Sequence, residues 1–207
     1  MGFYEERVLP RVVELTCGGK RMEVVRRPAL DGLAGTVVEL GFGSGTNVGL
    51  YPPAVERVLA VEPSELARAR AAKRIAGHPE PPVEFVGLDG AHLALDAASV
   101  DAVLSTWTLC TIPDVERAID EVRRVLRPGG ELHFLDHGLS DDPRVARWQH
   151  RLEPIQKRLG GGCHLTRDPA GLVRGGGLRI VREEHFRLAG PRVFTTMTSG
   201  VAVKDVG

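Results

Sequence analysis

The residues with the clearest chemical potential form the segment Glu39-Leu40-Gly41-Phe42-Gly43-Ser44-Gly45. The segment follows a β-branched run, at a place where a strand is expected to turn into a helix. Glycines at such a turn allow a tight bend and let a ligand approach the backbone closely. The spacing differs from the GxGxxG of dinucleotide sites, because the third glycine comes one residue early and Thr46 fills its place. We therefore expect Gly41, Gly43 and Gly45 to contact a ligand.

Glu39 distinguishes between the ligand classes that use such a turn. A carboxylate two residues before the first glycine disfavours a pyrophosphate and attracts an ammonium group. S-adenosylmethionine carries an α-ammonium and a sulfonium. The charge therefore favours this cofactor, and an NAD-binding protein is the disfavoured alternative.

A second acidic residue, Glu62, stands 21 residues after Gly41, at the end of the next strand-like run. A carboxylate in this position accepts hydrogen bonds from ribose hydroxyls. Pro63, which follows it, is assigned to the same site. The plainer alternative for Glu62 is a helix-entry residue near Ser64.

Asp89 follows the third strand-like run and is our candidate acceptor for the adenine amino group. Backbone at Gly90 and Ala91 would then contact the ring edge, although an Asp-Gly pair also forms ordinary turns. After the fourth run, we expect Thr106 and Leu109 to pack on the methionyl side of the cofactor.

The residues that would contact a second substrate, the acceptor, are less clearly indicated by the sequence. His137 comes directly after the fifth run and is the main catalytic candidate, as a base or as an orienting group, with a backbone-bonded loop histidine as the alternative. Asp136, its neighbour, is a possible partner or an exposed loop acid. His164 is a weaker candidate for substrate contact, and a glycine-flanked surface residue otherwise.

No metal site is expected. If the expected sulfonium ligand gives up its methyl group, it leaves as a neutral thioether, and this step needs no metal ion. Cys163 and His164 lack a second pair of ligands, and Cys110 fits a small buried apolar residue. The three cysteines, with Cys17, form no CxxC and are odd in number, which argues against a disulfide framework and for a reducing setting.

Alternating strand-like and helix-like segments supply the scaffold for these residues. Ser64 is suited to cap a helix that ends at Gly77, and Pro113 to open a helix that ends before Pro128. A further amphipathic helix is expected over residues 141–157. Five buried strands are predicted at residues 36–40, 57–61, 83–86, 100–105 and 131–135.

Two more strands, over residues 178–188 and 193–203, read as a hairpin. The pattern predicts an α/β fold, namely a doubly wound, Rossmann-like, seven-stranded sheet, mostly parallel with one antiparallel edge strand. Residues 1–33 are expected to form a helical segment outside the sheet that covers the acceptor pocket as a lid, and residues 34–207 the main domain.

Composition narrows the function. The chain has 207 residues, 27 basic and 27 acidic side chains, and 5% aromatic residues, which argues against a nucleic-acid partner. It contains neither an apolar run of about 18 residues nor a signal-peptide pattern, so we expect no transmembrane segment and a cytoplasmic location. The sequence makes no prediction of oligomeric state.

Three motifs carry a family resemblance: residues 37–45, the acid Glu62, and Val125-Leu126-Arg127-Pro128-Gly129-Gly130-Glu131. Over residues 35–140 the chain resembles class I S-adenosylmethionine-dependent methyltransferases, of the methyltransferase type 11 domain. Over residues 35–204 it is similar to the small alkyl-thiol methyltransferases related to animal methyltransferase-like membrane enzymes. The narrower resemblance rests on Leu50-Tyr51-Pro52-Pro53, Thr108-Leu109-Cys110, Phe134-Leu135-Asp136-His137, residues 162–167 and residues 200–204.

The resemblance implies S-adenosylmethionine as donor, S-adenosylhomocysteine as product and a small-molecule acceptor, with S-methylation of a thiol as the first expectation. Alternatives are an amine, a phospholipid headgroup or a quinone as acceptor, and a non-catalytic cofactor-binding protein. Asp136 stands where the relatives have Glu, His164 where they have Asn, and the anchor of the animal proteins is lacking. Arg144, Arg147 and Arg151 share a helical face, which indicates a solvated surface or peripheral membrane contact.

Overall fold

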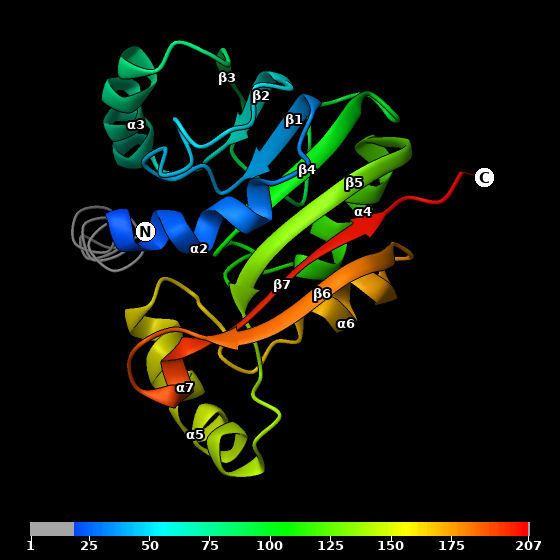
Figure 1. Cartoon of the computed structure of the whole chain (residues 1–207). Coiled ribbons are helices and arrows are strands. Elements are labelled where there is room, and N and C mark those ends of the chain that lie inside the picture. The colour runs from blue at the N-terminus through cyan, green and yellow to red at the C-terminus, as the bar shows by residue number, and fades with distance from the viewer. Residues whose placement is uncertain (1–18, 207) are drawn as a thin grey trace.

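The computed structural model describes residues 19–206 and arranges seven strands in one sheet (Figure 1). The strand order is β3-β2-β1-β4-β5-β7-β6. The strands are β1 (Gly35–Leu40), β2 (Val55–Val61), β3 (Val83–Gly87), β4 (Val100–Thr106), β5 (Leu126–His137), β6 (Arg179–Arg187) and β7 (Thr196–Val203).

Six strands run in the same direction, and β7 runs against its two neighbours, β5 and β6. The central strand β1 is buried on both faces, as the apolar run predicts, with Val38 opposite Leu59 of β2 and Val103 of β4. The predicted α/β, doubly wound sheet is confirmed. The antiparallel strand lies one position in from the edge, and β6 forms the edge itself.

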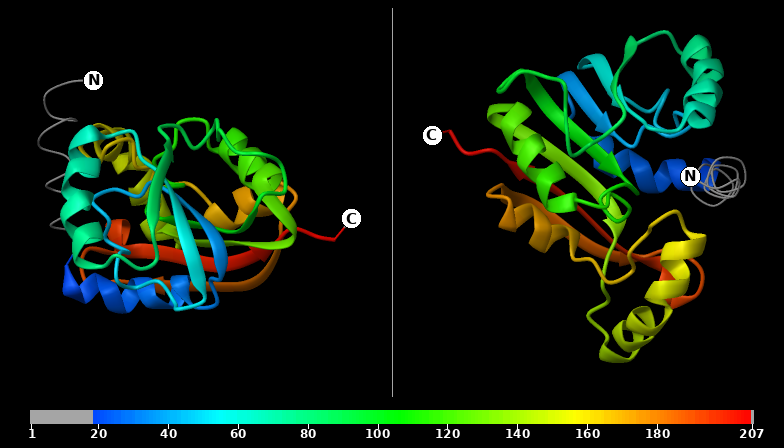
Figure 2. Two further views of the ribbon diagram at one scale, coloured as in Figure 1. Left: turned by 90° about the horizontal axis from the view of Figure 1, so that it is seen from above. Right: turned by 180° about the vertical axis from the view of Figure 1, so that it is seen from behind.

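Helices cover both faces of the sheet (Figures 1 and 2). Leu30 and Leu33, at the end of α2 and just after it, pack with Ala71 of α3 on one face, and α4 and α6 pack on the other. The helices are α2 (Lys20–Leu30), α3 (Glu65–Gly77), α4 (Val115–Val125), α5 (Pro143–Leu159), α6 (Pro169–Gly175) and α7 (Arg192–Thr195).

Local sequence explains several helix boundaries. The Ser64 side chain accepts a hydrogen bond from the Ala67 amide at 3.2 Å, so that it caps α3 as predicted. Asp114, rather than Pro113, is the N-cap of α4. The side chains of Val115, Ile119 and Val122 on α4 are buried, in agreement with their helical spacing.

The segment after β1 differs from the expectation. Instead of a helix, residues 41–51 form successive turns, with backbone hydrogen bonds from Gly45 to Phe42, from Val48 to Gly45 and from Leu50 to Asn47. Gly45 and Gly49 have φ angles of 75° and 83°, which lie outside the right-handed helical region. The glycines that make the turn possible therefore also prevent the helix.

The fifth strand is longer than predicted, because β5 includes Pro128-Gly129-Gly130 and reaches His137. Within residues 19–206, none of the helices is long and apolar enough to span a bilayer.

Candidate functional site

The predicted site residues gather at the carboxyl ends of the parallel strands. The strand order reverses between β1 and β4, because β1 pairs with both β2 and β4 while the chain crosses from one side of the sheet to the other. Ligands of doubly wound folds bind in the crevice outside such a switch point. Glu39, Glu62 and Thr106 all lie at this edge.

The glycine turn is built for close approach. Gly41, Gly43 and Gly45 have φ angles of 67°, 58° and 75°, which glycine adopts without strain. A Cβ atom at Gly41 would overlap the side chain of Thr108, in the turn after β4. The turn is therefore held directly against the segment that follows β4.

Glu62 secures the other side of the turn. One carboxylate oxygen accepts from the Gly43 amide and the other from the Ser64 amide, both at 2.8 Å. Burial raises the pKa of this carboxyl, and the two amides act against that rise. Each oxygen keeps a second lone pair, so the group retains the capacity to accept from two ligand hydroxyls. Its neighbour Pro63 is exposed.

Glu39 lies in a buried hydrogen-bond network. Its Oε1 accepts from Asn47 Nδ2 at 2.8 Å, and its Oε2 accepts from the Tyr51 hydroxyl. Burial raises the pKa of Glu39 to about 7, although Tyr51, Asn47 and Arg26 all favour the ionised form. This carboxyl therefore changes charge near neutral pH, which makes it sensitive to a cationic ligand.

Arg26 of α2 extends this network across the sheet edge. Its Nη1 donates to Asn47 Oδ1 at 3.0 Å and to Thr106 Oγ1 at 2.9 Å, and its guanidinium lies 4.5 Å from the centre of the Trp107 ring. Trp107 has a φ of 55°, unusual for a residue with a side chain and typical of constrained functional positions.

Sequence reasoning gave no site role to Arg26, Asn47, Tyr51 and Trp107, although Tyr51 stands in one of the motifs that carry the family resemblance. Asn47 and Tyr51 lie eight and twelve residues after Glu39, beyond the glycine turn, and only the fold brings Arg26 to the same edge. The available signal was the position of Asn47 and Tyr51 in the same crossover as the glycines.

Asp89 lies in an exposed turn after β3. Its carboxylate accepts from the Ala91 amide at 2.8 Å and pairs with His92 Nδ1 at 2.9 Å, and the hydrogen bond from His92 lowers its pKa. Gly90 packs within reach of Leu40 and Ile112, so this turn borders the end of β1.

Leu109 is fully buried, in a cluster that includes Leu40 at the end of β1 as well as Ile119 of α4 and Ala170 of α6. Its expected contact with the methionyl side of the cofactor stays a prediction.

On the acceptor side, the exposed loop acid proposed as one alternative for Asp136 is wrong, because its side chain is buried at the end of β5. Asp136 is fully buried and accepts from the Cys110 amide at 3.2 Å and from Ser105 Oγ at 3.4 Å. Burial raises the pKa of Asp136 to about 7. His137 Nδ1 faces the sulfur atoms of Cys110 and Cys163.

His164 Nδ1 lies 2.7 Å from Glu153 Oε1 of α5. Burial and the neighbouring Arg167 and Lys157 lower the pKa of His164. The side chain is thus engaged in holding the loop after α5 against that helix.

Comparison with known proteins agrees with this geometry. The methyltransferase domain family matches residues 38–134. The chain is 38% identical over 144 residues to thiol S-methyltransferase TMT1B of Homo sapiens, covering 67% of this chain and 59% of that protein. It is 31% identical over 147 residues to phosphatidylethanolamine N-methyltransferase of Cereibacter sphaeroides, covering 69% of this chain and 71% of that protein.

Among solved structures, phosphoethanolamine N-methyltransferase 2 of Haemonchus contortus in complex with S-adenosyl-L-methionine superposes with a TM-score of 0.72 at 12% identity. The superposition covers 98% of this chain and 59% of the Haemonchus contortus chain. The chain spans about 55 to 65% of the length of the curated thiol S-methyltransferases that it matches.

Proposed function

This chain belongs to the S-adenosylmethionine-dependent methyltransferases with a methyltransferase domain, and we propose that it methylates the sulfur of a small thiol. The observation that carries the proposal is the pair of buried carboxylates, Glu39 and Glu62, on either side of a glycine turn at the switch point of the sheet. When bound, S-adenosylmethionine supplies an electrophilic methyl group and leaves as S-adenosylhomocysteine.

The residues at the edge fit this cofactor in charge and in space. Glu39 and the turn backbone hold the methionyl ammonium group, and Thr106 lies beside them. Glu62, next to Pro63, accepts from the ribose hydroxyls. Asp89 and the backbone of Gly90 and Ala91 receive the adenine. A Cβ at Gly43 would meet only the Gly41 carbonyl oxygen, at 3.8 Å, so this part of the turn leaves its backbone open to a ligand.

Most of the catalytic help comes from placing the acceptor in line with the methyl group and from excluding water. A thiolate is already a strong nucleophile, so it needs only modest activation. His137 acts on the acceptor, as a base or by orienting it. Asp136 precedes it at the end of β5, and His164 is the weaker candidate for acceptor contact, from the loop between α5 and α6.

The N-terminal segment supports water exclusion. We propose that residues 1–33 form a helical lid on the methyltransferase domain of residues 34–207. Residues 1–18 lie outside the described part, but α2 already contacts the site through Arg26, which donates to Thr106 and stacks on Trp107.

The thiol acceptor is the choice favoured by sequence similarity, because four relatives at 36–38% identity carry the name thiol S-methyltransferase. An amine or a lipid headgroup is the second candidate, since the bacterial phosphatidylethanolamine N-methyltransferase is 31% identical over much of its length.

An acceptor panel tests the proposal. The protein is incubated with isotope-labelled S-adenosylmethionine and matched thiols, amines and quinols, and both products are measured by mass spectrometry. We expect S-adenosylhomocysteine and a methyl thioether in equal amounts from the thiols. Label transfer only to amines or quinols would reassign the acceptor, and cofactor binding without transfer would indicate a non-catalytic binding protein.

We also propose that the protein works in the cytoplasm, with peripheral contact to a membrane surface through α5. Cys110 and Cys163 are free thiols, in keeping with a reducing compartment. Trp148, Ile155 and Leu159 are 53 to 58% exposed on α5, and the Arg151 guanidinium lies 5.3 Å from the centre of the Trp148 ring. Exposed apolar and basic groups together favour an anionic lipid surface.

Sedimentation with vesicles tests this contact. The protein should pellet with vesicles that contain phosphatidylserine and remain in solution with pure phosphatidylcholine, and Trp148→Ala should weaken the binding. If the protein pellets equally with both kinds of vesicle, or pellets with neither, the proposed membrane contact is contradicted.

A further inference from the structure

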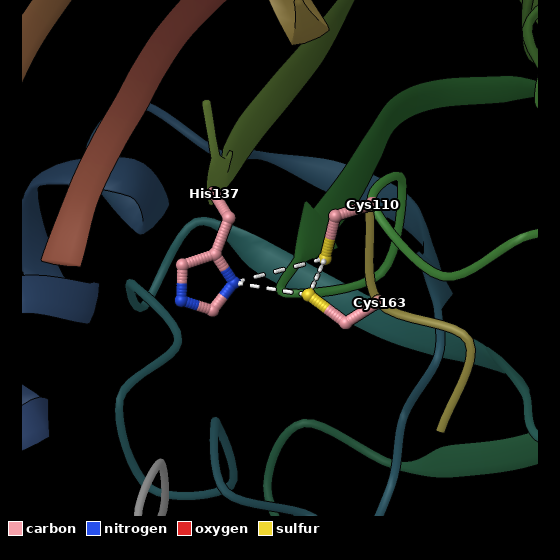
Figure 3. Close-up of side chains that lie close together, drawn as sticks. All are labelled: Cys110, His137 and Cys163. Atoms are coloured by element: carbon pink, nitrogen blue, oxygen red, sulfur yellow. Dashed lines mark hydrogen bonds between the residues drawn. The ribbon is translucent and has the colours of Figure 1, made fainter. Parts of the chain in front are cut away.

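Three side chains from separate segments converge beside the acceptor side of the site (Figure 3). Cys110 lies in the turn after β4, His137 is the last residue of β5, and Cys163 lies in the loop between α5 and α6. The two sulfur atoms are 3.6 Å apart, and His137 Nδ1 lies 3.5 Å from Cys163 Sγ and 3.9 Å from Cys110 Sγ.

These separations fit the edges of a small coordination polyhedron. Zinc binds cysteine sulfur at about 2.3 Å and histidine nitrogen at about 2.0–2.1 Å, with tetrahedral angles. Such bonds place two sulfurs about 3.8 Å apart and a sulfur and a nitrogen about 3.6 Å apart. Each of the three distances is within a few tenths of an ångström of these values, so one ion can reach all three donors without rearrangement of the chain.

The cluster is buried and bordered by groups of both charges. Both cysteines are buried, at 1% and 5% exposure, and the buried carboxyl group of Asp136 contacts the Cys110 amide. Arg167, which donates to the Leu109 carbonyl, lies near the two sulfurs. The two sulfurs are within hydrogen-bond distance of each other, and a divalent ion bound to both would stabilise them as thiolates.

The donors are held in place by neighbouring groups, as metal ligands commonly are. The carbonyl of Cys110 accepts from the His164 amide at 2.8 Å, and Gln156 hydrogen-bonds to Cys163. The imidazole of His137 bonds to the backbone of Phe194. Since Nδ1 faces the sulfurs, Nε2 is left for that bond, which keeps the Nδ1 lone pair directed at the cluster.

We propose that Cys110, His137 and Cys163 bind one zinc ion and leave its fourth position for the acceptor thiolate. Three protein ligands with an open position are typical of catalytic zinc, and sulfur ligands select zinc over magnesium or calcium. His137 is only partly buried, so the cluster has an open side. The role in catalysis rests on the proposed function, while the binding of zinc does not.

Atoms and charges balance in the proposed methyl transfer to the zinc-bound sulfur. The acceptor thiol loses its proton to solvent as its sulfur binds zinc. That sulfur attacks the methyl carbon, the bond from the methyl carbon to the sulfonium sulfur breaks, and a methyl thioether and neutral S-adenosylhomocysteine result. The thioether is a weaker zinc ligand than the thiolate, which favours release of the product.

Metal binding to the full chain is the first test. The protein is stripped with a chelator under a thiol-free reductant, dialysed against zinc without S-adenosylmethionine, and analysed for metal content. Cobalt is added in a parallel sample to detect sulfur-to-metal charge-transfer bands. We expect one ion per chain, and a loss of at least about tenfold in affinity for Cys110→Ser, Cys163→Ser and His137→Gln. His150→Gln, an exposed histidine of α5, is the control and should bind like the original chain.

Thermal unfolding shows whether each variant is folded, so that lost metal binding can be told apart from lost structure. Added zinc should raise the Tm of the original chain and of His150→Gln but leave that of Cys163→Ser unchanged, while all metal-free forms unfold cooperatively. Folded protein with less than about 0.2 ions per chain, or a Cys163→Ser variant that binds normally, overturns the site. So does a preference for copper with no zinc uptake, or a Cys110–Cys163 disulfide in place of the ion.

Activity separates the two proposals. If zinc binds and no thiol is methylated, the metal site stands and the proposed function fails. If thiols are methylated equally well with and without the ion, the proposed function stands and the catalytic role of zinc fails.

Discussion

Glu62 holds the glycine turn in place and is also the proposed acceptor for the ribose hydroxyls. Its oxygens accept from the amides of Gly43, in the turn after β1, and of Ser64, just after β2. A neutral amide in this position offers one acceptor oxygen and turns a donor group toward an amide. Replacing Glu62 by glutamine therefore tests the cofactor assignment directly.

We expect Glu62→Gln to weaken S-adenosylmethionine binding by about 10- to 150-fold, because a hydrogen bond to a charged group contributes ~1.5–3 kcal/mol. Isothermal titration calorimetry measures the effect. Glu56→Gln, an exposed carboxylate at the other end of β2, is the control and should bind normally. An unchanged affinity in Glu62→Gln would remove Glu62 from the ribose site.

Glu39 gives the binding a pH dependence. Burial raises its pKa to about 7 in the free protein, so the carboxyl is protonated below neutral pH and must lose that proton to pair with an ammonium group. Affinity for S-adenosylmethionine should rise by up to about tenfold per pH unit between about pH 5.5 and 7, and level off above. Calorimetry over this range measures it, and Glu39→Gln should flatten the profile. If the affinity still rises with pH in Glu39→Gln, the proton that is lost on binding belongs to another group.

The proposed metal ligands could not be recognised as a group from the sequence, because the fold alone brings them together. Cys110, His137 and Cys163 are separated by 27 and 26 residues, so no local spacing connects them. Cys110 and His137 each follow a parallel strand, and the meeting of strand ends at one edge was foreseeable. Cys163 arrives from a loop after α5, whose path is set by tertiary contacts such as the pair of His164 with Glu153.

At the scale of secondary structure, α2 joins the N-terminal part of the described chain to the sheet. Leu30 is buried with Val37, Phe42 and Leu104. His133 Nδ1 lies 2.8 Å from the carbonyl oxygen of Ala29. The helix therefore depends on tertiary packing rather than on propensity, and Pro28 lies inside it.

Leu30→Ala should lower the free energy of unfolding by about 2–5 kcal/mol, because it leaves a cavity in a fully packed core. Val24→Ala on the same helix, where the side chain is 72% exposed, should change it by less than about 0.5 kcal/mol. Urea denaturation compares the two variants. Equal effects would mean that α2 is not packed on the sheet in solution.

The order and type of the main elements followed from hydrophobic periodicity and capping residues, because buried parallel strands and Ser64-type caps leave local signals. Other features did not, among them the short helices α6 and α7. The turns over residues 41–51 replace a helix because several glycines there adopt positive φ. β5 extends through Pro128-Gly129-Gly130, where the Gly129 amide donates to the Lys204 carbonyl and the Lys204 amide donates to the Gly130 carbonyl.

At the scale of the whole molecule, the ligand site joins segments from both halves of the sheet. The glycine turn and Glu62 come from the side of β1 and β2, and Thr106 with Trp107 from the side of β4. A ligand that contacts both sides stabilises the native state as a whole.

S-adenosylmethionine at 100 times its Kd should add about 2.7 kcal/mol of stability, which raises the Tm of a chain of this size by roughly 5–11 °C. NAD at the same concentration should leave the Tm unchanged, because Glu39 repels its pyrophosphate. Scanning fluorimetry distinguishes the two ligands. A shift with NAD and none with S-adenosylmethionine would contradict the cofactor assignment.

The contact of Gly41 with Thr108 has a consequence for how such sequences can diverge. A methyl group at position 41 is excluded by the threonine side chain and is disfavoured again by the φ of 67°. A homologue that replaces this glycine therefore needs a smaller residue at position 108 and a different backbone path in the same lineage. We expect the two positions to vary jointly across descendants, so that the donor-binding turn and the loop that carries Cys110 evolve as one unit.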